Sequence, residues 1–386
     1  DWYLYKYSLA ISAIPFLSFS VANLIKAVYG KNKKALILDL DNTLWEGVIG
    51  DDGPEGIEIG EETSLGQAYR EFQSYIKMHK DIGILLAINS KNDLENAVSG
   101  LTHPDGLLRP EDFQVIKANW NNKDANIREI AQELNLGADS FVFVDDNIVE
   151  RDIVKKGTQG VAVPEIVTVE SYITTIDKAG YFEIIELSKE DIVRNQMYKV
   201  NVERKTAQKE FFDYTEYLLS LEMIADIKTF ESIYVSRIAQ LTNKTNQFNL
   251  TTKRFSQSEI ELIMADDLTI KISGRLRDKF GDNGVTSLVI GTIEDTIMNI
   301  ELWLMSCRVL KRNMEFAMMD ALVEEALEKG IKTIKGYYIK TAKNQMVKEF
   351  YGSMGFKLIG QEGENTIWQL ELEAYQSLNK VIQVNV

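Results

Sequence analysis

The sequence predicts a doubly wound α/β domain followed by a second domain of the α+β class. In the first half, short apolar runs alternate with helical patterns, which is typical of a parallel sheet covered on both faces. The first of these runs, Ala35–Leu38, ends directly in the acidic pair Asp39 and Asp41. After about Glu216 the pattern changes to separate helices and alternating strands, which is typical of the α+β class.

The expected elements divide the chain into four parts. Strands are expected in the first half at Ala35–Leu38, Gly83–Ile88, Phe141–Val144 and Gly160–Val163. Helical patterns cover Ser64–Lys80, Asp93–Gly100 and Asp124–Leu134. We therefore predict an N-terminal helical segment at residues 1–30, the α/β domain at 31–166, a helical linker at 167–215 and the α+β domain at 216–386.

The N-terminal segment carries no charge between Lys6 and Lys26, which raises the question of a membrane span or a signal sequence. Four serines, Asn23 and Pro15 interrupt this stretch. We therefore expect a helix that packs against the first domain, and no membrane.

Composition excludes several classes of function. The chain has 43 Lys and Arg against 58 Asp and Glu, a net charge of −15, which argues against non-specific nucleic-acid binding. One cysteine rules out a disulfide framework and favours a cytoplasmic location. Two histidines leave little room for zinc sites or a Ser-His-Asp triad.

Acidic residues follow two of the predicted strands. Asp39 and Asp41 come after the first strand, and Asp145 and Asp146 follow Phe141–Val144. The carboxyl ends of parallel strands are where open α/β sheets bind their ligands. Neighbouring carboxylates repel each other unless a cation offsets their charge, and hard oxygen ligands suit Mg²⁺. The alternative is a strand that simply runs into an Asp-Asn turn.

These acids belong to a set of four motifs that resembles the haloacid dehalogenase (HAD) superfamily of phosphatases and phosphotransferases. The set consists of Asp39 to Thr43, Ser90, Lys123, and Asp145 with Asp146. The resemblance is closest to the FkbH-like subfamily and covers nearly the whole chain, through residues 39–53, 145–151, 243–249 and 305–308.

The resemblance implies a role for each motif. Asp39 is expected to be the nucleophile that forms an aspartyl-phosphate, and Asp41 the proton shuttle. Asp39, the backbone carbonyl of Asp41, and Asp145 or Asp146 would hold one Mg²⁺. The phosphoryl group would be bound by Asn42, Thr43, Asn89, Ser90 and Lys123. Taken alone, Ser90 and Lys123 are better explained as a helix cap and a surface lysine. Their register with Asp39 and Asp145 favours the functional interpretation instead.

The insert after the first motif is small. It consists of a turn-rich flap, Glu46–Gly60, and one helix, so the HAD-type domain has a minimal cap. An open site favours a macromolecular or carrier-bound substrate. FkbH-like enzymes are associated with loading a glyceryl unit from 1,3-bisphosphoglycerate onto an acyl carrier protein. Their usual cysteine before the motif serine is Asn89 here, and asparagine cannot form a thioester.

A strand that runs into a basic loop and helix at Arg308 is followed downstream by Asn344, Phe350-Tyr351 and Gly355-Phe356. Through these residues the second half resembles the GNAT acyltransferase fold. Expected elements include a helix at Ile233–Leu241, a hairpin turn at Asp282-Asn283-Gly284, a strand at Ile297–Met305 and a helix at Glu315–Glu328. GNAT enzymes bind a pyrophosphate with a glycine-rich loop. The glycine positions hold Lys311 and Asn313 here, and side chains there impede a close approach of the ligand.

The basic stretch at this loop is a second candidate site. Arg308, Lys311 and Arg312 lie at the start of a helix, where positive charge opposes the helix dipole. A bound anion would reverse that penalty, so this stretch and Cys307 could receive the phosphopantetheine arm or acidic residues of a carrier protein. The alternatives are a solvated basic turn and, for Cys307, a small buried residue.

Together these observations predict a cytoplasmic, Mg²⁺-dependent HAD-type phosphatase or phosphotransferase. It would remove phosphate from a phosphorylated acyl donor while an acyl carrier protein is loaded. One alternative is a phosphatase acting on another substrate, with the GNAT-like half only docking a carrier. Another is an active GNAT acyltransferase with a scaffold HAD domain.

Overall fold

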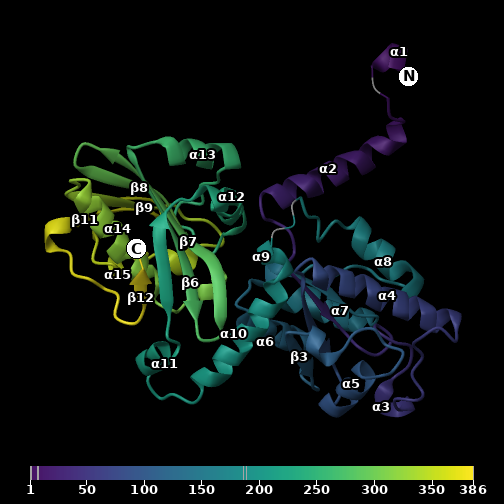
Figure 1. Ribbon diagram of the computed structural model, residues 1–386. Coiled ribbons are helices and arrows are strands. Elements are labelled where there is room, and N and C mark those ends of the chain that lie inside the picture. The colour runs from purple at the N-terminus through teal and green to yellow at the C-terminus, as the bar shows by residue number, and fades with distance from the viewer. Residues whose placement is uncertain (1, 7, 186, 188, 386) are drawn as a thin grey trace. The chain divides into compact units, whose positions relative to one another are not determined.

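A computed structural model of the chain describes residues 2–6, 8–185, 187 and 189–385 (Figure 1). The chain divides into two compact units, Asp1–Lys199 and Val200–Val386. Each unit has its own sheet, and the buried apolar residues of each unit form clusters of their own.

Unit 1 alternates strands and helices. In chain order its elements are α1 (Trp2–Tyr5), α2 (Ile14–Val28), β1 (Ala35–Leu38), α3 (Ile49–Asp52), α4 (Ser64–Asp81), β2 (Leu85–Ser90), α5 (Leu94–Leu101), β3 (Val115–Ala118), α6 (Lys123–Leu134), β4 (Phe141–Val144), α7 (Ile148–Gly157), α8 (Val169–Lys178), α9 (Lys189–Ile192) and α10 (Arg194–Gln208), which runs across the unit boundary.

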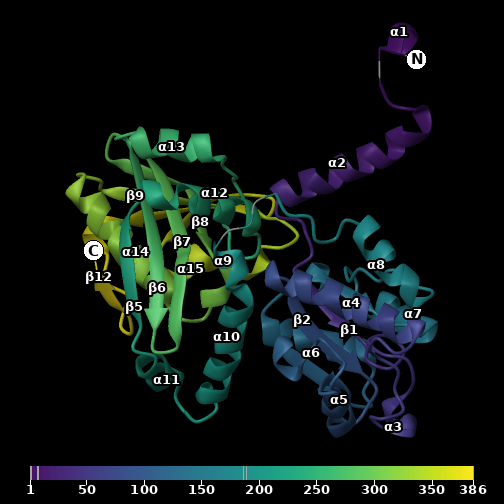
Figure 2. The same cartoon turned by 45° about the vertical axis from the view of Figure 1, so that its right-hand side comes forward.

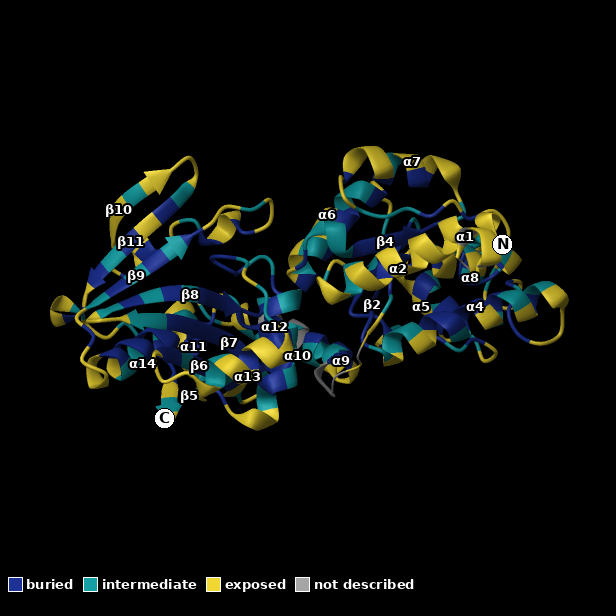
Figure 3. Cartoon of the chain, turned by 90° about the horizontal axis from the view of Figure 1, so that it is seen from above, coloured by how far each residue is buried: buried dark blue, intermediate teal, exposed yellow. Residues whose placement is uncertain are grey.

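The four strands form one parallel sheet in the order β3-β2-β1-β4, which confirms the predicted α/β class. In β1, β2 and β4 every residue is buried, as the dark blue strands of Figure 3 show. The register pairs Leu38 with both Ile88 and Val144. The chain therefore leaves β1, β2 and β4 at the same edge of the sheet, and the polar residues that follow them meet there.

Two predictions for unit 1 are wrong. Gly160–Val163 is not a strand, because only Ala162 pairs with β4, in a single bridge to Val142. The fourth strand is instead β3, whose sequence Val-Ile-Lys-Ala carries Lys117 in place of a continuous apolar run. In addition, α8 lies within the predicted linker, yet its residues Tyr172 and Ile176 belong to the core of unit 1.

The N-terminal helix forms, but the prediction that it packs against the first domain is wrong. In α2 only Asn23 is buried, and apolar side chains such as Phe16 and Ile25 are exposed. By length and composition alone, Ile11–Val28 is sufficient to cross a membrane, and 6% of these residues are buried.

Unit 2 is a mixed α+β unit, as predicted. Its elements are α11 (Tyr214–Ser220), β5 (Ile224–Thr229), α12 (Val235–Lys244), α13 (Gln257–Ala265), β6 (Thr269–Asp278), β7 (Gly281–Glu294), β8 (Ile297–Met305), α14 (Met314–Glu328), β9 (Thr333–Tyr338), α15 (Phe350–Ser353), β10 (Lys357–Glu362), β11 (Asn365–Glu371) and β12 (Gln383–Asn385).

Its eight strands follow the order β10-β11-β9-β8-β7-β6-β5-β12. Residues of α14 and α15 join one apolar core with strand residues of the sheet, and residues of α12 and α13 join another (Figure 2). Strands β8 and β9 are parallel and pair only through Ile297–Asn299 and Thr333–Lys335.

Beyond that pairing, another segment of the same chain uses the edge of β8. The backbone N–H of Leu250 donates to the carbonyl of Trp303 at 3.0 Å, and that of Met305 donates to the carbonyl of Phe248 at 3.0 Å. The residue after β9, Ile339, donates to the carbonyl of Leu250 at 2.8 Å. The segment Phe248–Leu250 thus hydrogen-bonds to the C-terminal end of β8 and to the residue after β9, where these two strands are no longer paired with each other.

The predicted hairpin turn is displaced. The turn between β6 and β7 lies at Lys279 and Phe280, because Asp278 pairs with Gly281. The Asp-Asn-Gly sequence falls inside β7, where the register shifts and Gly284 has a φ of +67°. The predicted turn required a residue with a positive φ. Gly284 has one, but it lies at a β-bulge and not in the turn.

A buried charge cluster ties the loop before α14 to the end of β6. The side chain of Asp278 is fully buried and pairs with Arg204 at 2.7 Å and Arg312 at 3.1 Å. Arg312 also donates to Oδ1 of Asn201 at 2.7 Å. Removing one partner from such a cluster leaves buried charge uncompensated.

We therefore predict that Asp278→Asn lowers the free energy of unfolding of unit 2 by about 3–5 kcal/mol, because two buried guanidinium groups lose their counter-charge. Urea unfolding of the full chain measures this loss. The control is Asp226→Asn, which breaks the more exposed pair with Arg277 and is expected to cost less than about 1 kcal/mol. Equal losses for the two variants would contradict the prediction.

Candidate functional site

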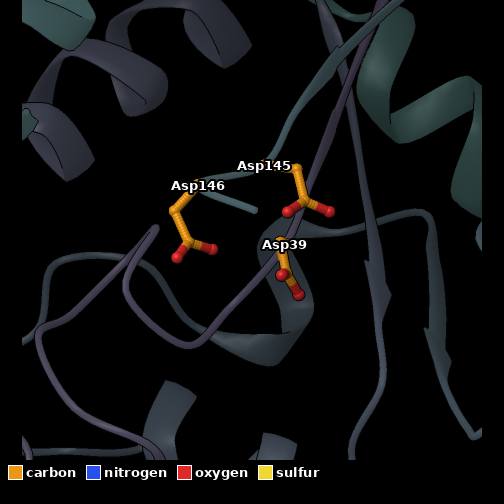
Figure 4. A group of neighbouring side chains, drawn as sticks. All are labelled: Asp39, Asp145 and Asp146. Carbon is orange, nitrogen blue, oxygen red and sulfur yellow. The ribbon is translucent and has the colours of Figure 1, made fainter. Parts of the chain in front are cut away.

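Three aspartates converge at the carboxyl edge of the unit 1 sheet. Asp39 follows β1, and Asp145 and Asp146 follow the adjacent β4 (Figure 4). Each offers a carboxylate oxygen, and these oxygens lie within 4.8 Å of one another. Asp145 is fully buried and Asp39 nearly so. Oδ1 of Asp39 is buried without a hydrogen-bond partner in the structure. This unused oxygen and the all-oxygen donor set fit a hard divalent cation.

Lys123 places a positive charge directly against these acids. It is the first residue of α6 and is 2% exposed. Its Nζ lies 2.7 Å from Oδ2 of Asp39 and 2.5 Å from Oδ2 of Asp145. One ammonium group therefore offsets part of the repulsion between two buried carboxylates, and the predicted proximity of Lys123 to the aspartates is observed.

The pKa values of the site reflect burial and mutual repulsion. Burial, followed by the charge of Asp39, raises the pKa of Asp145 to about 7. The same two causes raise the pKa of Asp146 above its usual range. Burial acts to lower the pKa of Lys123, but the carboxylates of Asp39 and Asp145 raise it overall.

Asp41 is held by three hydrogen bonds. Its Oδ1 accepts from Nε1 of Trp45 at 3.0 Å and from the backbone N–H of Ile49 at 3.1 Å. Its Oδ2 accepts from Nδ2 of Asn92 at 2.9 Å. Burial raises the pKa of Asp41 in spite of the donors Ile49 and Trp45. A carboxyl group with a raised pKa and a fixed orientation suits proton donation to a leaving group.

The loop after Asp41 is fixed by residues from two helices. Asn42 has a φ of +53°, and its carbonyl accepts from the hydroxyls of Tyr69 at 3.3 Å and Tyr172 at 3.1 Å. Its side chain accepts from the backbone N–H of Gly47 at 3.0 Å. Thr43 is fully buried, and its Oγ1 accepts from the backbone N–H of Asp146 at 3.2 Å. Asn42 and Thr43 thus shape the site through contacts within the chain.

The structure corrects the prediction for Asn89. Its side chain is fully buried and points to α6, where Nδ2 donates to the carbonyl of Lys123 at 2.9 Å. It therefore does not face a phosphoryl group. Ser90, the last residue of β2, is 2% exposed, and its carbonyl accepts from the backbone N–H of Asn119 at 3.1 Å.

Sequence reasoning missed several residues that support the site. Besides Trp45 and Asn92 at Asp41, Arg151 donates from Nη1 to the backbone carbonyls of Asp145 and Asp146, both at 2.7 Å. Arg151 lies in the stretch that resembles the FkbH-like subfamily, and that was its only signal. No local pattern marks Asn92, because its partner lies 51 residues away.

The predicted basic site of unit 2 is largely turned inward. Arg308 and Arg312 are buried, and burial together with Arg204 lowers the pKa of Arg312 to about 10. Lys311 is exposed, with a φ of +64°. Cys307 is partly exposed in a single 3-10 turn. The expectation that Arg312 presents its charge to a partner is therefore wrong, since Asp278 already neutralises it.

Comparison with known proteins gives matches among solved structures. No protein-family model and no curated protein matches the chain. A solved structure described as the N-terminal part of the protein BF1531 from Bacteroides fragilis, containing a phosphatase domain complexed with Mg, is 41% identical. The match covers 48% of this chain and 50% of that one, with a TM-score of 0.46, so it spans about half the length of that structure.

Acetyltransferases also match, more weakly. The ribosomal-protein-S18-alanine N-acetyltransferase from Escherichia coli is 12% identical, covering 39% of this chain and 94% of that one, with a TM-score of 0.31. A GNAT-family acetyltransferase from Streptococcus pneumoniae is 14% identical, covering 39% and 99%, also with a TM-score of 0.31.

The parallel sheet of unit 1 and the three aspartates at its carboxyl edge agree with the fold and the acidic site that the resemblance to the HAD superfamily implied. The identity of 41% to a phosphatase-domain structure, over about half of each chain, is in line with the expectation of an enzyme. The chain therefore combines an α/β unit that carries a small flap with a mixed α+β unit, as the sequence predicted.

The raised pKa of Asp145 has a consequence for stability. Between pH 5 and 8, an unfolded aspartate is ionised, whereas folded Asp145 holds a proton up to about pH 7. The folded state then binds more protons, so stability falls as pH rises. We predict that the melting temperature of the metal-free protein falls from pH 5 to 8.

Calorimetry in the presence of a chelator measures this slope. Asp145→Asn is expected to flatten it, because the neutral amide does not titrate. The exposed Asp152 provides the control, since Asp152→Asn should leave the slope unchanged. A metal-free protein whose stability rises from pH 5 to 8 would contradict the prediction.

Proposed function

We propose that the protein is a Mg²⁺-dependent phosphatase or phosphotransferase of FkbH type that works through an aspartyl-phosphate on Asp39. The observation that carries the proposal is the convergence of Asp39, Asp145 and Asp146 within 4.8 Å, with Lys123 bound to two of them. The identity of 41% to a phosphatase-domain structure complexed with Mg supports it.

Mg²⁺ would be held by Asp39, Asp145 or Asp146 and the carbonyl of Asp41, and it would supply positive charge that lets a carboxylate approach a phosphate. An oxygen of Asp39 then forms a bond to phosphorus while the bond from phosphorus to the leaving oxygen breaks. Asp41 gives its proton to that oxygen and later takes one from the water that releases phosphate. Lys123 and Ser90 hold the phosphoryl oxygens.

We further propose a phosphorylated acyl unit, such as a phosphoglyceryl group, as the substrate and an acyl carrier protein as its acceptor. The resemblance to FkbH-like enzymes and the small flap support this choice. The thioester bond forms when a thiol of the carrier attacks the acyl carbon and the acyl phosphate leaves. Attack of Asp39 at that phosphorus would release a free carboxylate instead, so Asp39 would act on the ester phosphate of the donor. The lone cysteine supports a cytoplasmic location, and the excess of acidic residues supports a reaction without nucleic acid.

The alternative is a phosphatase that acts on another phosphorylated substrate, with unit 2 only docking a carrier.

We infer that unit 2 does not act as an ordinary GNAT acetyltransferase. The edge groups of β8 at Trp303 and Met305 are already paired with Phe248 and Leu250, so a ligand cannot pair with them. The side chain of Lys311 also stands where a close-binding loop would have glycine.

Asp39→Asn tests the phosphatase proposal. Because the amide oxygen is a poor nucleophile, phosphate release from acetyl phosphate should fall about a thousandfold or more with folding intact. A phosphate-release assay measures the rate, and circular dichroism checks the fold. The exposed Asp152→Asn is the control with full activity. Unchanged release by Asp39→Asn would refute the aspartyl-phosphate.

Intact mass spectrometry tests the acyl substrate. The protein is incubated with Mg²⁺, 1,3-bisphosphoglycerate and an acyl carrier protein with or without its phosphopantetheine arm. We expect a glyceryl unit on the armed carrier alone. Phosphate release without any acylated carrier would leave the phosphatase and remove the carrier-loading role.

A further inference from the structure

The two residues proposed to hold the phosphoryl group stand on different elements. Ser90 ends β2, whereas Lys123 begins α6, and β3 lies between them in the chain. Phosphoryl transfer depends on fixed positions of such groups, and a misplacement of about 1 Å can cost ~100-fold in rate. The rate of phosphoryl transfer should therefore depend on the distance between Ser90 and Lys123.

Three asparagine side chains connect the two residues. Asn89, next to Ser90, donates from Nδ2 to the carbonyl of Lys123 at 2.9 Å. Its Oδ1 accepts from Nδ2 of Asn126 at 3.0 Å. Nδ2 of Asn126 also donates to Oδ1 of Asn119 at 3.0 Å, and the backbone N–H of Asn119 donates to the carbonyl of Ser90. These hydrogen bonds form an unbroken series from the backbone of Ser90 to the backbone of Lys123.

The chemistry of the partners fixes the orientation of each amide. The carbonyl of Lys123 only accepts, so Asn89 turns its NH₂ group to it and its oxygen to Asn126. The oxygen of Asn119 accepts from the backbone N–H of Asn121 at 3.0 Å, so it also presents an oxygen to Asn126. Asn126 therefore faces two acceptors, and both hydrogens of its single NH₂ group are used.

The position of Asn126 makes it the centre of this network. Asn89 and Asn126 are both fully buried, so water does not replace a missing donor easily. An apolar or acidic side chain at position 126 would leave the buried Oδ1 of Asn89 without a donor, and Oδ1 of Asn119 with only the backbone N–H of Asn121. Asn89 would then be free to turn, and the start of α6 would lose its link to the end of β2.

We propose that Asn126 is a positioning residue for phosphoryl transfer, which holds Lys123 at a fixed distance from Ser90 and Asp39. This inference rests on the proposed function, because it assigns the phosphoryl group to Ser90 and Lys123. A residue with only a structural role would change stability but would not depend on the presence of the Lys123 ammonium.

A double-mutant cycle separates the two roles. It compares the unsubstituted protein with Asn126→Leu, Lys123→Met and the double variant, with Mg²⁺ present. In the Lys123 background, Asn126→Leu should lower kcat for acetyl phosphate about tenfold and weaken orthovanadate binding by a similar factor. In the Lys123→Met background both effects should be less than about twofold. If the leucine variant does not fold, Asn126→Asp replaces it in the cycle, because aspartate keeps the size of the side chain. The same losses of kcat and of orthovanadate binding are then expected.

Asn195 offers a matched control in unit 1. It is buried, its Nδ2 donates to the carbonyls of Lys80 at 2.7 Å and Ile84 at 3.2 Å, and its Oδ1 has no partner, like that of Asn126. Its contacts lie before β2, at the opposite end from Ser90. Asn195→Leu should lower the melting temperature to a similar extent and leave kcat unchanged.

The outcomes distinguish the inference from the proposed function. Equal losses in both Lys123 backgrounds, or an equal loss of kcat in Asn195→Leu, would overturn the positioning role. If the unsubstituted protein releases no phosphate from acetyl phosphate, the proposed function fails instead. Orthovanadate binding, measured by calorimetry, then still tests the inference. A loss of affinity in Asn126→Leu that disappears in the Lys123→Met background supports the positioning role, and an equal loss in both backgrounds overturns it.

Discussion

The site depends on one interaction, the ammonium group of Lys123 between the carboxylates of Asp39 and Asp145. Two buried acids at this distance repel each other, and burial disfavours the charged form of Asp145. A single cation from α6 offsets part of this cost and leaves net negative charge for a divalent ion. The start of α6 and the residues that follow β1 and β4 all have to meet at one point for this pairing to exist.

The sequence was informative where chemistry and local pattern coincide. Asp39 and Asp145 could be predicted because each follows a short apolar strand, and parallel strands bring such ends together. Lys123 could be predicted only through the order of the motifs, since a lysine before a helix is by itself an ordinary surface residue. Asn92, Asn126 and Tyr172 could not be found, because amides and phenols gain their roles only from partners that are distant in the chain.

Similar reasons explain the errors in the fold. The edge strand β3 was missed because Lys117 breaks its apolar run, while an edge position tolerates such a residue. In unit 2, basic residues were interpreted as exposed charge. The buried Asp278, 34 residues before Arg312, changes that interpretation, because an internal counter-ion makes a guanidinium group part of the packing. Formal charge in a sequence does not indicate exposure when such a partner exists.

The burial of Asn89 has a consequence for the route of the acyl group. This position is enclosed between β2 and α6, so a thiol placed there could not reach a substrate in the open site. An acceptor for the carbon chain would have to arrive by diffusion and compete with water for an activated ester. Tethering changes this competition, because a binding module on the same polypeptide raises the local concentration of an acceptor to roughly the millimolar range. A catalytically silent second unit would then still determine how much of the activated group is captured and how much is hydrolysed.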